Sequence, residues 1–458
     1  MPISTHTQFH QMEIGKVGDA HPPIMATSFQ FCRWAYFRMT GEQTTGQSLL
    51  YVAWAFLLWG GVLLMLLSNQ PFWKNRENSQ KPYWIVGVLL FLLLWSMLDL
   101  SDEPRIIMKD TGMLAAYLFA VGCLMNIPSK GLFRWCIALV VLFFLFYGTA
   151  LRHNAIFALI PLLCWFVWNL STRKKCIPVL ACAFILWGGM LMAIQFVNYN
   201  VIGAIRLYTL QERFYADIFH LNARTSHFVL PPNSFGNDFS GLDETVFRAL
   251  FNSKKLYIES AFERLKEEFP QKKWMFGPDV IVIRADNEDG AVEYVSNFDG
   301  NTKWEHRVLN EEFVREQYPK DYLTLRSAWI DRILQDPVTF VKFKTVFFIK
   351  YCRECSLYFL GLNPLFLLPL ISLLALSPVW TRDLFKQATF PGVMLAWSAL
   401  LYILPLWMFL PDGTAAGGFR YLFWFFAASI IAITCFCSQS PLFHEIIQTI
   451  HRYLEKKA

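Results

Sequence analysis

Several charged side chains adjoin long apolar stretches of the sequence, where a charge is costly unless it has a partner or a function. Arg152 and Arg420 each stand at the start of such a stretch, and the planar guanidinium of arginine suits a phosphate group. Asp102, Glu103 and Asp110 lie in one short segment, and their oxygen atoms could coordinate a divalent cation. Ordinary interpretations remain open for both sets, because terminal arginines often extend to the membrane surface and acidic loops are commonly only solvated.

The composition places these residues in a membrane protein. Of the 458 residues, 55% are hydrophobic and 17% are charged, whereas a soluble domain carries roughly 25% charged residues. The mean hydropathy is +0.34. These values exclude an ordinary soluble enzyme and a disordered chain. None of the ten cysteines falls in segment 198–340, which argues against a disulfide scaffold. The net charge of +6 is too small to indicate a nucleic-acid partner.

The apolar stretches have the length of membrane-spanning helices, since a bilayer core of about 30 Å needs about 20 apolar residues. None alternates with the period of two that a membrane β-barrel requires. The sequence therefore predicts a polytopic α-helical membrane protein, because helices satisfy their own backbone groups in lipid. The nine candidate spans are 49–68, 82–99, 111–127, 133–150, 154–170, 177–197, 363–380, 389–410 and 418–437.

Basic residues in the short connections define an orientation, because Lys and Arg concentrate on the cytoplasmic side. The basic set of alternate connections is predicted to be cytoplasmic, and it contains Lys74, Arg76, Lys81, Lys130, Arg134, Arg173, Lys174, Lys175, Arg382, Lys386 and the tail 438–458. The other set, which includes segment 198–340, is expected outside. Segment 198–340 has a net charge of −5, whereas the rest of the chain has +11. Residues 1–48 are also expected outside, yet they contain no signal peptide. Either this N-terminus crosses the membrane unaided, or the natural chain begins further upstream with an additional helix. We favour the second alternative, and we expect nine or ten spans in total.

The outer segment 198–340 is predicted to fold as one mixed α/β domain. Residues 244–269 are expected to be helical, and 279–284 and 291–297 to be short strands. The chain from Tyr322 to Phe359 has an amphipathic helical pattern, in which aromatic residues alternate with Arg332 and Lys344. Such a pattern suits a helix at the membrane interface. The predicted organisation is 1–48 as an outer loop with an interfacial helix at 23–41, 49–197 as spans one to six, 198–340 as the outer domain, 341–362 as an interfacial helix, 363–437 as spans seven to nine, and 438–458 as the cytoplasmic tail.

Short motifs give a family resemblance that extends along the chain. Residues 18–25 contain an Asp-x-His-Pro-Pro-apolar sequence that begins at Asp19, in an outer loop that precedes an interfacial helix and a span. This arrangement resembles the first outer loop of GT-C membrane glycosyltransferases, in particular the protein-mannosyltransferase and aminoarabinose-transferase-like superfamily. The further similar features are the pair Lys109-Asp110, the sequence Arg152-His153-Asn154-Ala155, the sequence Phe419-Arg420-Tyr421, and the entry (217–232) and exit (329–340) of the outer segment.

The resemblance implies a hexosyl- or pentosyltransferase of the bacterial inner membrane. Such enzymes transfer a sugar from a polyprenyl-phosphate donor to an envelope glycan, lipid or protein on the outer face. Asp19 and His21 would then be catalytic, with a base taking the proton of the acceptor hydroxyl. The cations Lys109, Arg152 and Arg420 would bind the donor phosphate and steady its departure. A divalent cation is a further expectation, with Asp102, Glu103 and Asp110 as its ligands.

The first outer loop departs from the family pattern, and other functions remain open. Family members have an acidic residue near the start of this loop as catalytic base, but no carboxylate precedes Glu13 here, so His6, Glu13 and Asp19 are alternative bases. A polysaccharide polymerase or ligase would also join sugars outside the membrane, from a diphosphate-linked chain. A lipid-linked sugar transporter or flippase ranks last, because it would need ionisable residues in mid-span and repeat symmetry.

Overall fold

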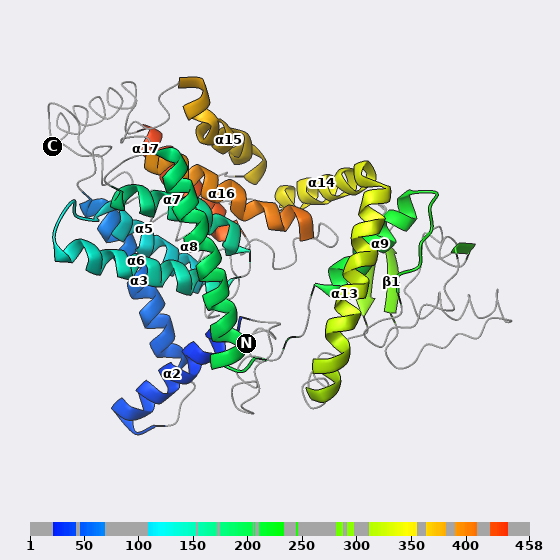
Figure 1. The fold of residues 1–458 in the computed structure, drawn as a ribbon, viewed down its shortest axis with the longest axis horizontal. Coiled ribbons are helices and arrows are strands. Elements are labelled where there is room, and N and C mark those ends of the chain that lie inside the picture. The colour runs from blue at the N-terminus through cyan, green and yellow to red at the C-terminus, as the bar shows by residue number, and fades with distance from the viewer. Residues whose placement is uncertain are drawn as a thin grey trace, which may run out of the picture.

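The computed structural model describes the helices of the chain and part of segment 198–340. The described residues are 22–42, 46–68, 109–152, 154–171, 175–204, 206, 210–232, 244–245, 281–286, 291–296, 311–354, 363–381, 390–409 and 422–437. Most of the helices form one bundle, and a second group lies to its side, joined to it through one helix (Figure 1).

The bundle is built from the apolar stretches of the sequence. Its helices are α3 (Gln47–Leu67), α5 (Lys109–Met125), α6 (Leu132–Leu151), α7 (Ala155–Leu170), α8 (Cys176–Phe196), α15 (Pro364–Thr381), α16 (Phe390–Phe409) and α17 (Phe423–Cys437). Each coincides with a predicted span to within a few residues. The predicted span 82–99 lies outside the described residues. Helix α8 continues into a short π-helix, Val197–Val201, at the point where the chain leaves the bundle.

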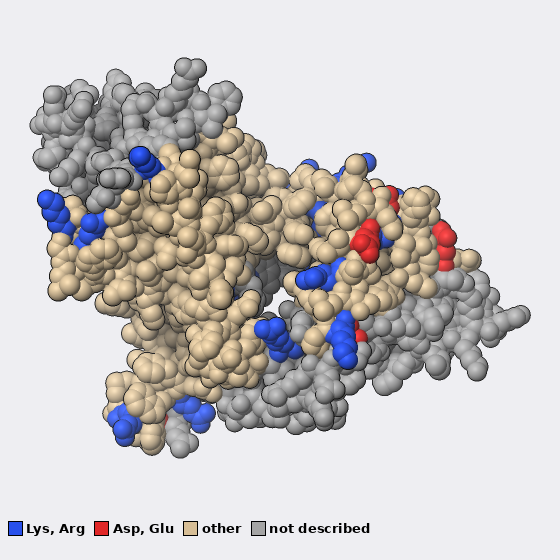
Figure 2. Space-filling model, in the orientation of Figure 1, with Lys and Arg blue, Asp and Glu red and all other residues tan. Residues whose placement is uncertain are grey.

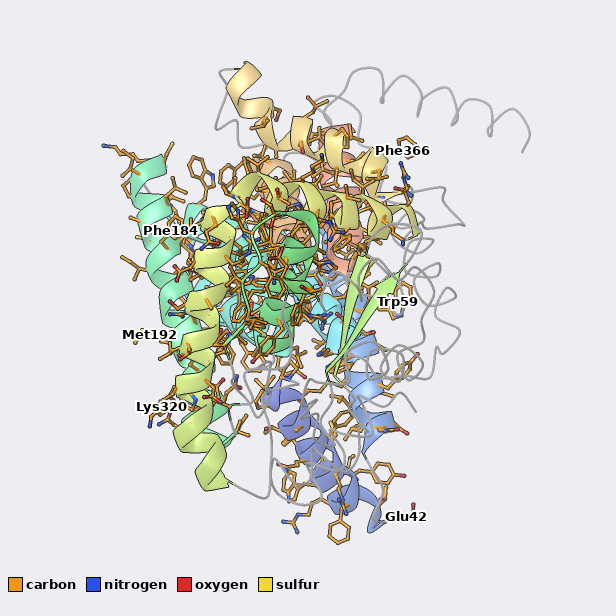
Figure 3. The ribbon with its side chains drawn as sticks, turned by 90° about the vertical axis from the view of Figure 1, so that its right-hand side faces the viewer. Glu42, Trp59, Phe184, Met192, Lys320 and Phe366 are labelled. Carbon is orange, nitrogen blue, oxygen red and sulfur yellow. The ribbon has the colours of Figure 1, made fainter. Side chains whose placement is uncertain are left out.

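The bundle belongs to a helical membrane protein. Within the described part of the chain, four helices are long and apolar enough to cross a membrane, namely 47–67, 132–151, 176–201 and 390–409. Helices α7, α15 and α17 also contain apolar segments, which are shorter. Large apolar side chains such as Trp59, Phe184, Met192 and Phe366 are exposed and project from the bundle (Figure 3). These side chains suit contact with lipid. The expected total of nine or ten spans stays a prediction.

Helix α5 lies at the centre of the bundle, in contact with α3, α6, α7 and α17. Fourteen of its 17 residues are buried. It approaches α3 closely through two glycines. A Cβ atom at Gly61 would lie 2.6 Å from the backbone of Leu118 and Phe119, and one at Gly122 would lie 2.6 Å from the carbonyl oxygen of Gly61. Small residues at such positions allow helix backbones to approach in a membrane bundle.

Helix α2 (Pro23–Thr40) precedes the bundle and packs against α3 and α6. The helix predicted for residues 23–41 is therefore present. Its N-terminal half buries Met25 and Phe29, whereas Phe31 and Trp34 are exposed. It ends at Gly41, whose φ of 76° is left-handed. Its location at a membrane interface stays a prediction.

The second group contains α9 (Gln211–Arg224), α13 (Glu311–Gln335) and α14 (Pro337–Glu354), together with strands β1 (Ile281–Asp286) and β2 (Ala291–Ser296). The strands pair antiparallel, and β2 lies against α9. Helix α14 contacts α15 and α16 on one side and α9 and α13 on the other. On the face in Figure 2, charged side chains are sparse over the bundle and gather over this second group and the end of α2.

Segment 198–340 differs in part from the expectation. Strands occur where the sequence predicted them, but two strands paired with each other do not establish a mixed α/β domain. The predicted helix 244–269 lies outside the described residues except for 244–245, which are helical. The amphipathic stretch from Tyr322 is not one continuous helix, because α13 ends before Asp336 and α14 begins at Pro337. Proline disfavours helical backbone at the preceding residue, which explains the break.

Candidate functional site

An ion pair joins α5 to α6 at one end of the bundle. The Nε atom of Arg152 lies 2.7 Å from Oδ1 of Asp110, and the two side chains are only 10% and 1% exposed. Asp110 lies in the first turn of α5, and Arg152 is the C-cap residue of α6, where its backbone N–H donates to the carbonyl of Thr149. A helix carries partial positive charge at its N-terminus and partial negative charge at its C-terminus, so both helices stabilise the charge at their end.

Tyr402 of α16 and Asn154, the N-cap residue of α7, lie beside this ion pair. The Tyr402 side chain is within electrostatic range of Arg152, Asp110 and Asn154. The Tyr402 hydroxyl is buried, and the side chains of Asn154 and Arg152 are its hydrogen-bonding neighbours. The four side chains therefore form one polar group at this end of the bundle. We name Asp110, Arg152, Asn154 and Tyr402 the Arg152 cluster.

Two hydrogen-bonded chains hold the helices that carry this cluster. The Tyr117 hydroxyl of α5 lies 2.8 Å from the Thr149 hydroxyl of α6 and donates to the carbonyl of Ala155 in α7, at 3.1 Å. The Trp424 indole of α17 donates to Ser398 of α16 at 3.0 Å, and Ser398 donates to a carbonyl of α7 at 2.8 Å. The rings of Tyr117 and Trp424 also meet edge to face. The five helices are thereby fixed just inside the cluster.

The opposite end of the bundle is tied mainly to its own backbone. Arg134 of α6 donates to the carbonyls of Asn169 and Leu170 at the end of α7. Asn169 donates to a carbonyl of α5, and Asn126 donates to a carbonyl of α3. These bonds satisfy helix C-termini, which otherwise leave carbonyl groups without partners. This end therefore ties helices α3, α5, α6 and α7 together.

The structure brings together two residues of the predicted site. Arg152, predicted as a phosphate ligand, and Asp110, predicted at the rim of the same site and as a metal ligand, form the ion pair. Lys109 precedes Asp110 in the first turn of α5 and is partly exposed. The other predicted site residues lie outside the described residues: Asp19, His21, Asp102, Glu103 and Arg420, with the alternative bases His6 and Glu13.

The predicted divalent-cation site stays a prediction. Among the described residues, no group of three or more His, Cys, Asp or Glu side chains could hold a metal ion. Asp102 and Glu103 are not among those residues. Asp110 is, and its Oδ1 atom faces the guanidinium of Arg152. Because the Asp110 carboxylate already pairs with a guanidinium, it is better placed to hold Arg152 in position than to bind a metal ion.

Sequence reasoning did not single out Asn154 or Tyr402 as site residues. Asn154 stands within the quoted sequence Arg152-His153-Asn154-Ala155, and its position directly after Arg152 and His153 was the available signal. Tyr402 lies inside an apolar span, where tyrosine is common and indicates little by itself. Its relevance depends on the packing of α16 against α7, which the sequence does not reveal.

A second buried ion pair lies in the group formed by α9, α13 and α14. The Lys344 Nζ atom is 2.5 Å from Oδ1 of Asp217, and the side chains are 0% and 1% exposed. The Trp329 indole donates to Oδ2 of Asp217 at 3.0 Å. The Lys344 ammonium also lies over the rings of Phe340 and Phe343, a favourable cation–π arrangement. We name Asp217, Trp329 and Lys344 the Lys344 cluster; it joins the entry of the outer segment to its exit.

Burial shifts the pKa of each group in this second pair in the direction that favours its uncharged form. It raises the pKa of the Asp217 carboxyl, against the opposing effects of Lys344 and the Trp329 N–H. It lowers the pKa of the Lys344 ammonium, against the opposing effect of Asp217. The sequence pattern suggested that Lys344 lies at a membrane interface. In the structure its side chain is enclosed by protein and packed on a buried carboxylate. The location of this helix, predicted over 341–362, at a membrane interface stays a prediction.

Arg332 forms a third polar contact between the same helices. Its guanidinium donates to Asn222 Oδ1, to the Thr225 hydroxyl and to the carbonyl of His227, and it pairs with Asp336. The side chain of Arg332 is buried. The Arg332 guanidinium beside Asp336 holds the pKa of that carboxyl below its usual value. Arg332 thus connects the junction between α13 and α14 to the C-terminal end of α9.

Comparison with known proteins leaves the family resemblance as an expectation from the motifs. No protein-family model, no curated protein and no solved structure matches this chain.

Proposed function

We propose that the protein is a membrane glycosyltransferase of the GT-C type, which transfers a hexosyl or pentosyl group from a polyprenyl-phosphate donor. The acceptor is an envelope glycan, lipid or protein on the outer face of the bacterial inner membrane. We place segment 198–340, which includes α9, α13 and the two strands, on that outer side. The observation that carries the proposal is the Arg152 guanidinium, held by Asp110 at a buried end of an apolar helical bundle.

The geometry suits a lipid-linked phosphate. The headgroup of such a donor stands at the membrane surface while its chain lies in lipid, so its ligand must sit at the end of a span. Arg152 has this position at the C-cap of α6. A charge-assisted hydrogen bond is roughly twice as strong as a neutral one. Asp110 orients the guanidinium in advance, which removes the need to reorganise it when charge develops on the departing phosphate.

The remaining roles follow the motifs. Asp19 takes the proton of the acceptor hydroxyl, and His21 orients that acceptor or its base. Arg420 and Lys109 add positive charge beside the phosphate. The reaction inverts the configuration at the anomeric carbon of the sugar. The acceptor oxygen bonds to this carbon from one face, and the bond to the phosphate oxygen breaks on the opposite face. The electron pair of that bond leaves with the phosphate, and the acceptor proton goes to the base.

A polysaccharide polymerase or ligase is the second candidate, and it would use a diphosphate-linked chain. A transporter or flippase is less well supported. Transporters place ionisable groups near the bilayer centre. Asp110 and Arg152 instead occupy helix termini.

The test measures lipid binding by the full-length protein in nanodiscs. We expect it to bind polyprenyl phosphate more tightly than polyprenyl diphosphate, and Arg152→Ala to weaken this binding at least tenfold. Preference for the diphosphate would favour a polymerase, and absence of binding to either lipid would overturn the proposal. In parallel, envelope glycans of a deletion strain are examined by mass spectrometry. Loss of one monosaccharide supports a glycosyltransferase, whereas loss of whole chains supports a polymerase.

The orientation is tested by reporter fusions. Alkaline phosphatase fused after Asn287 should be active, because that position is proposed to lie outside, and the same reporter after Lys175 should be inactive. The reverse pattern would overturn the topology.

A further inference from the structure

The second half of α2 stands clear of the bundle and exposes three large aromatic side chains (Figures 1 and 3). Phe31 is 64% exposed, Trp34 is 55% exposed and Phe37 is 44% exposed. We name these residues, together with Arg33 and Arg38, the α2 face. We propose that the α2 face binds anionic phospholipids at the membrane surface, with its aromatic rings at the level of the headgroups and its arginines on the headgroup phosphates. This binding does not depend on the proposed enzymatic activity.

The helix that follows α2 gives the depth of the α2 face. Helix α3 is long enough to cross a membrane, so its N-terminus lies near one surface of the bilayer. Gly46 is the N-cap residue of α3, and it lies directly against α2, because a Cβ atom at Gly46 would be 2.6 Å from the carbonyl carbon of Cys32. The middle of α2 is therefore held at the level where the span begins.

Packing on the bundle determines which side of α2 is turned outward. The Ser28 hydroxyl lies 3.1 Å from the Tyr147 hydroxyl of α6, which also accepts from the Trp54 indole of α3 at 3.2 Å. Phe29 and Cys32 are buried on the same side of α2 as Ser28. With 3.6 residues per turn, the α2 face is centred on the opposite side of the helix. It is therefore turned away from the bundle and is available to lipid.

The chemistry of the α2 face suits an anionic headgroup region. Aromatic residues are enriched where a membrane meets water, because one part of such a side chain is apolar and another is polarisable or polar. The guanidinium of Arg38 lies 5.8 Å from the centre of the Trp34 ring, and the Phe31 ring lies 5.9 Å from that ring. Helix α2 contains Arg33 and Arg38 and no acidic residue, so its charge complements a negative surface.

A zwitterionic headgroup would match this charge less well, because its own ammonium group already balances the phosphate. A guanidinium can bind a phosphate through two parallel hydrogen bonds, and it keeps its charge at every physiological pH. A basic residue near an anionic membrane surface strengthens binding roughly fivefold. The two arginines therefore predict a preference for anionic over zwitterionic lipid, which a purely apolar face would not have.

The test asks which lipid contacts Phe37. The full-length protein is placed in nanodiscs with equal parts of phosphatidylglycerol and phosphatidylcholine, and photoreactive benzoylphenylalanine replaces Phe37. Phe184 is the matched control position, because it is an exposed phenylalanine in the middle of α8, where only acyl chains are within reach (Figure 3). After irradiation, mass spectrometry identifies the attached lipids.

We expect adducts at position 37 to contain roughly fivefold more phosphatidylglycerol than phosphatidylcholine, and adducts at position 184 to contain equal amounts. The double variant Arg33→Gln and Arg38→Gln should bring the ratio at position 37 close to that at position 184. Its unfolding temperature in detergent should stay that of wild type, because Arg38 is exposed and Arg33 is only partly buried. Adducts at position 184 in the double variant show that it is still inserted in the bilayer.

Each other outcome would overturn the proposal. Equal amounts of the two lipids at position 37 would mean that α2 touches lipid without selecting its headgroup. Adducts to protein would mean that a second copy or another segment covers the α2 face. No adduct at position 37, with normal adducts at position 184, would place the face in water. A lipid ratio that the double variant does not change would exclude the two arginines as the headgroup ligands. All these results leave the test of the proposed function unaffected, because that test measures polyprenyl lipids at Arg152.

Discussion

The two buried ion pairs of this protein have different surroundings. Lys344 and Asp217 are enclosed by aromatic rings and by the indole N–H of Trp329. Asp110 and Arg152 instead join the termini of two apolar helices, beside the polar side chains of Asn154 and Tyr402. A buried charge alone therefore does not indicate a functional site. The position of the pair distinguishes the two, because the headgroup of a lipid lies at the end of a membrane span.

The largest expected effect is on the stability of the enclosed pair. Lys344→Met removes the cation and leaves Asp217 buried without it, which should destabilise the fold by about 3–5 kcal/mol. Adding Asp217→Asn should restore most of this loss, because the amide oxygen can still accept from Trp329. Thermal unfolding in detergent measures both, and Lys342→Met, an exposed neighbour on α14, is the control. If the double variant is no more stable than Lys344→Met, the pair does not act as a unit.

The loss in Lys344→Met should depend on pH. Without Lys344, the pKa of Asp217 rises further above its unfolded value of about 3.9, because burial then acts with less opposition. A group whose pKa is raised in the folded state stabilises the fold below the unfolded pKa, and this contribution is lost as pH rises through the folded pKa. The deficit relative to wild type should therefore be smaller at pH 4 than at pH 7.5. An equal loss of stability at pH 4 and pH 7.5 would contradict the assignment of the pH dependence to Asp217.

The next effect concerns the packing that places Asp110. Gly61→Ala adds a Cβ atom 2.6 Å from the α5 backbone, so α3 and α5 must separate, at about 1–3 kcal/mol. Gly188→Ala is the control, because nothing lies within 4 Å of its Cβ position, and alanine there should leave stability equal or raise it. Unfolding temperatures compare the two. Equal effects would mean that α3 and α5 tolerate separation.

A smaller effect separates charge from geometry at Arg152. Arg152→Lys keeps a cation beside Asp110, so stability should change little. The ammonium lacks the planar fork that holds phosphate, so affinity for polyprenyl phosphate should fall roughly tenfold. Nanodisc binding and thermal unfolding are measured on the same preparation. Full retention of affinity would argue that Arg152 acts only as a point charge.

The smallest effect is expected at Asp336, where a partly exposed carboxylate pairs with Arg332. Asp336→Asn should cost less than about 1 kcal/mol, because Arg332 keeps its bonds to Asn222, Thr225 and the carbonyl of His227. The pKa of Asp336 is lowered in the fold, so its contribution is present above the unfolded pKa of about 3.9 and is lost as pH falls. Wild type and variant should differ at pH 7 and converge near pH 2. A difference that persists at pH 2 would show that it is not electrostatic.

The sequence predicted the helices better than their contacts. The spans at α3, α6, α8 and α16 follow from length and hydropathy alone, because lipid requires both. The break at Asp336 was missed, although Pro337 was its signal. The burial of Lys344 against Asp217 was also missed, because an amphipathic pattern does not distinguish a surface charge from one with a buried partner.

The candidate site was predictable only in part. Asp110 and Arg152 were identified separately, each from a charge at the end of an apolar stretch. Their contact depends on how α5 and α6 pack, which a single sequence does not specify. Tyr402 was missed because a tyrosine in an apolar span is ordinary until a neighbouring helix brings Asn154 and Arg152 beside it.

Helix α5 has almost no surface left for lipid, since 14 of its 17 residues are buried by its neighbours. It begins with Lys109 and Asp110, which do not favour insertion. An isolated α5 would therefore be a poor membrane helix, shorter than a typical span and charged at one end. We therefore expect α5 to be stable in the membrane only when α3 and α6 cover it. The Asp110–Arg152 pair can form only when α5 and α6 are docked, so the residue that orients the proposed phosphate ligand would also report that docking.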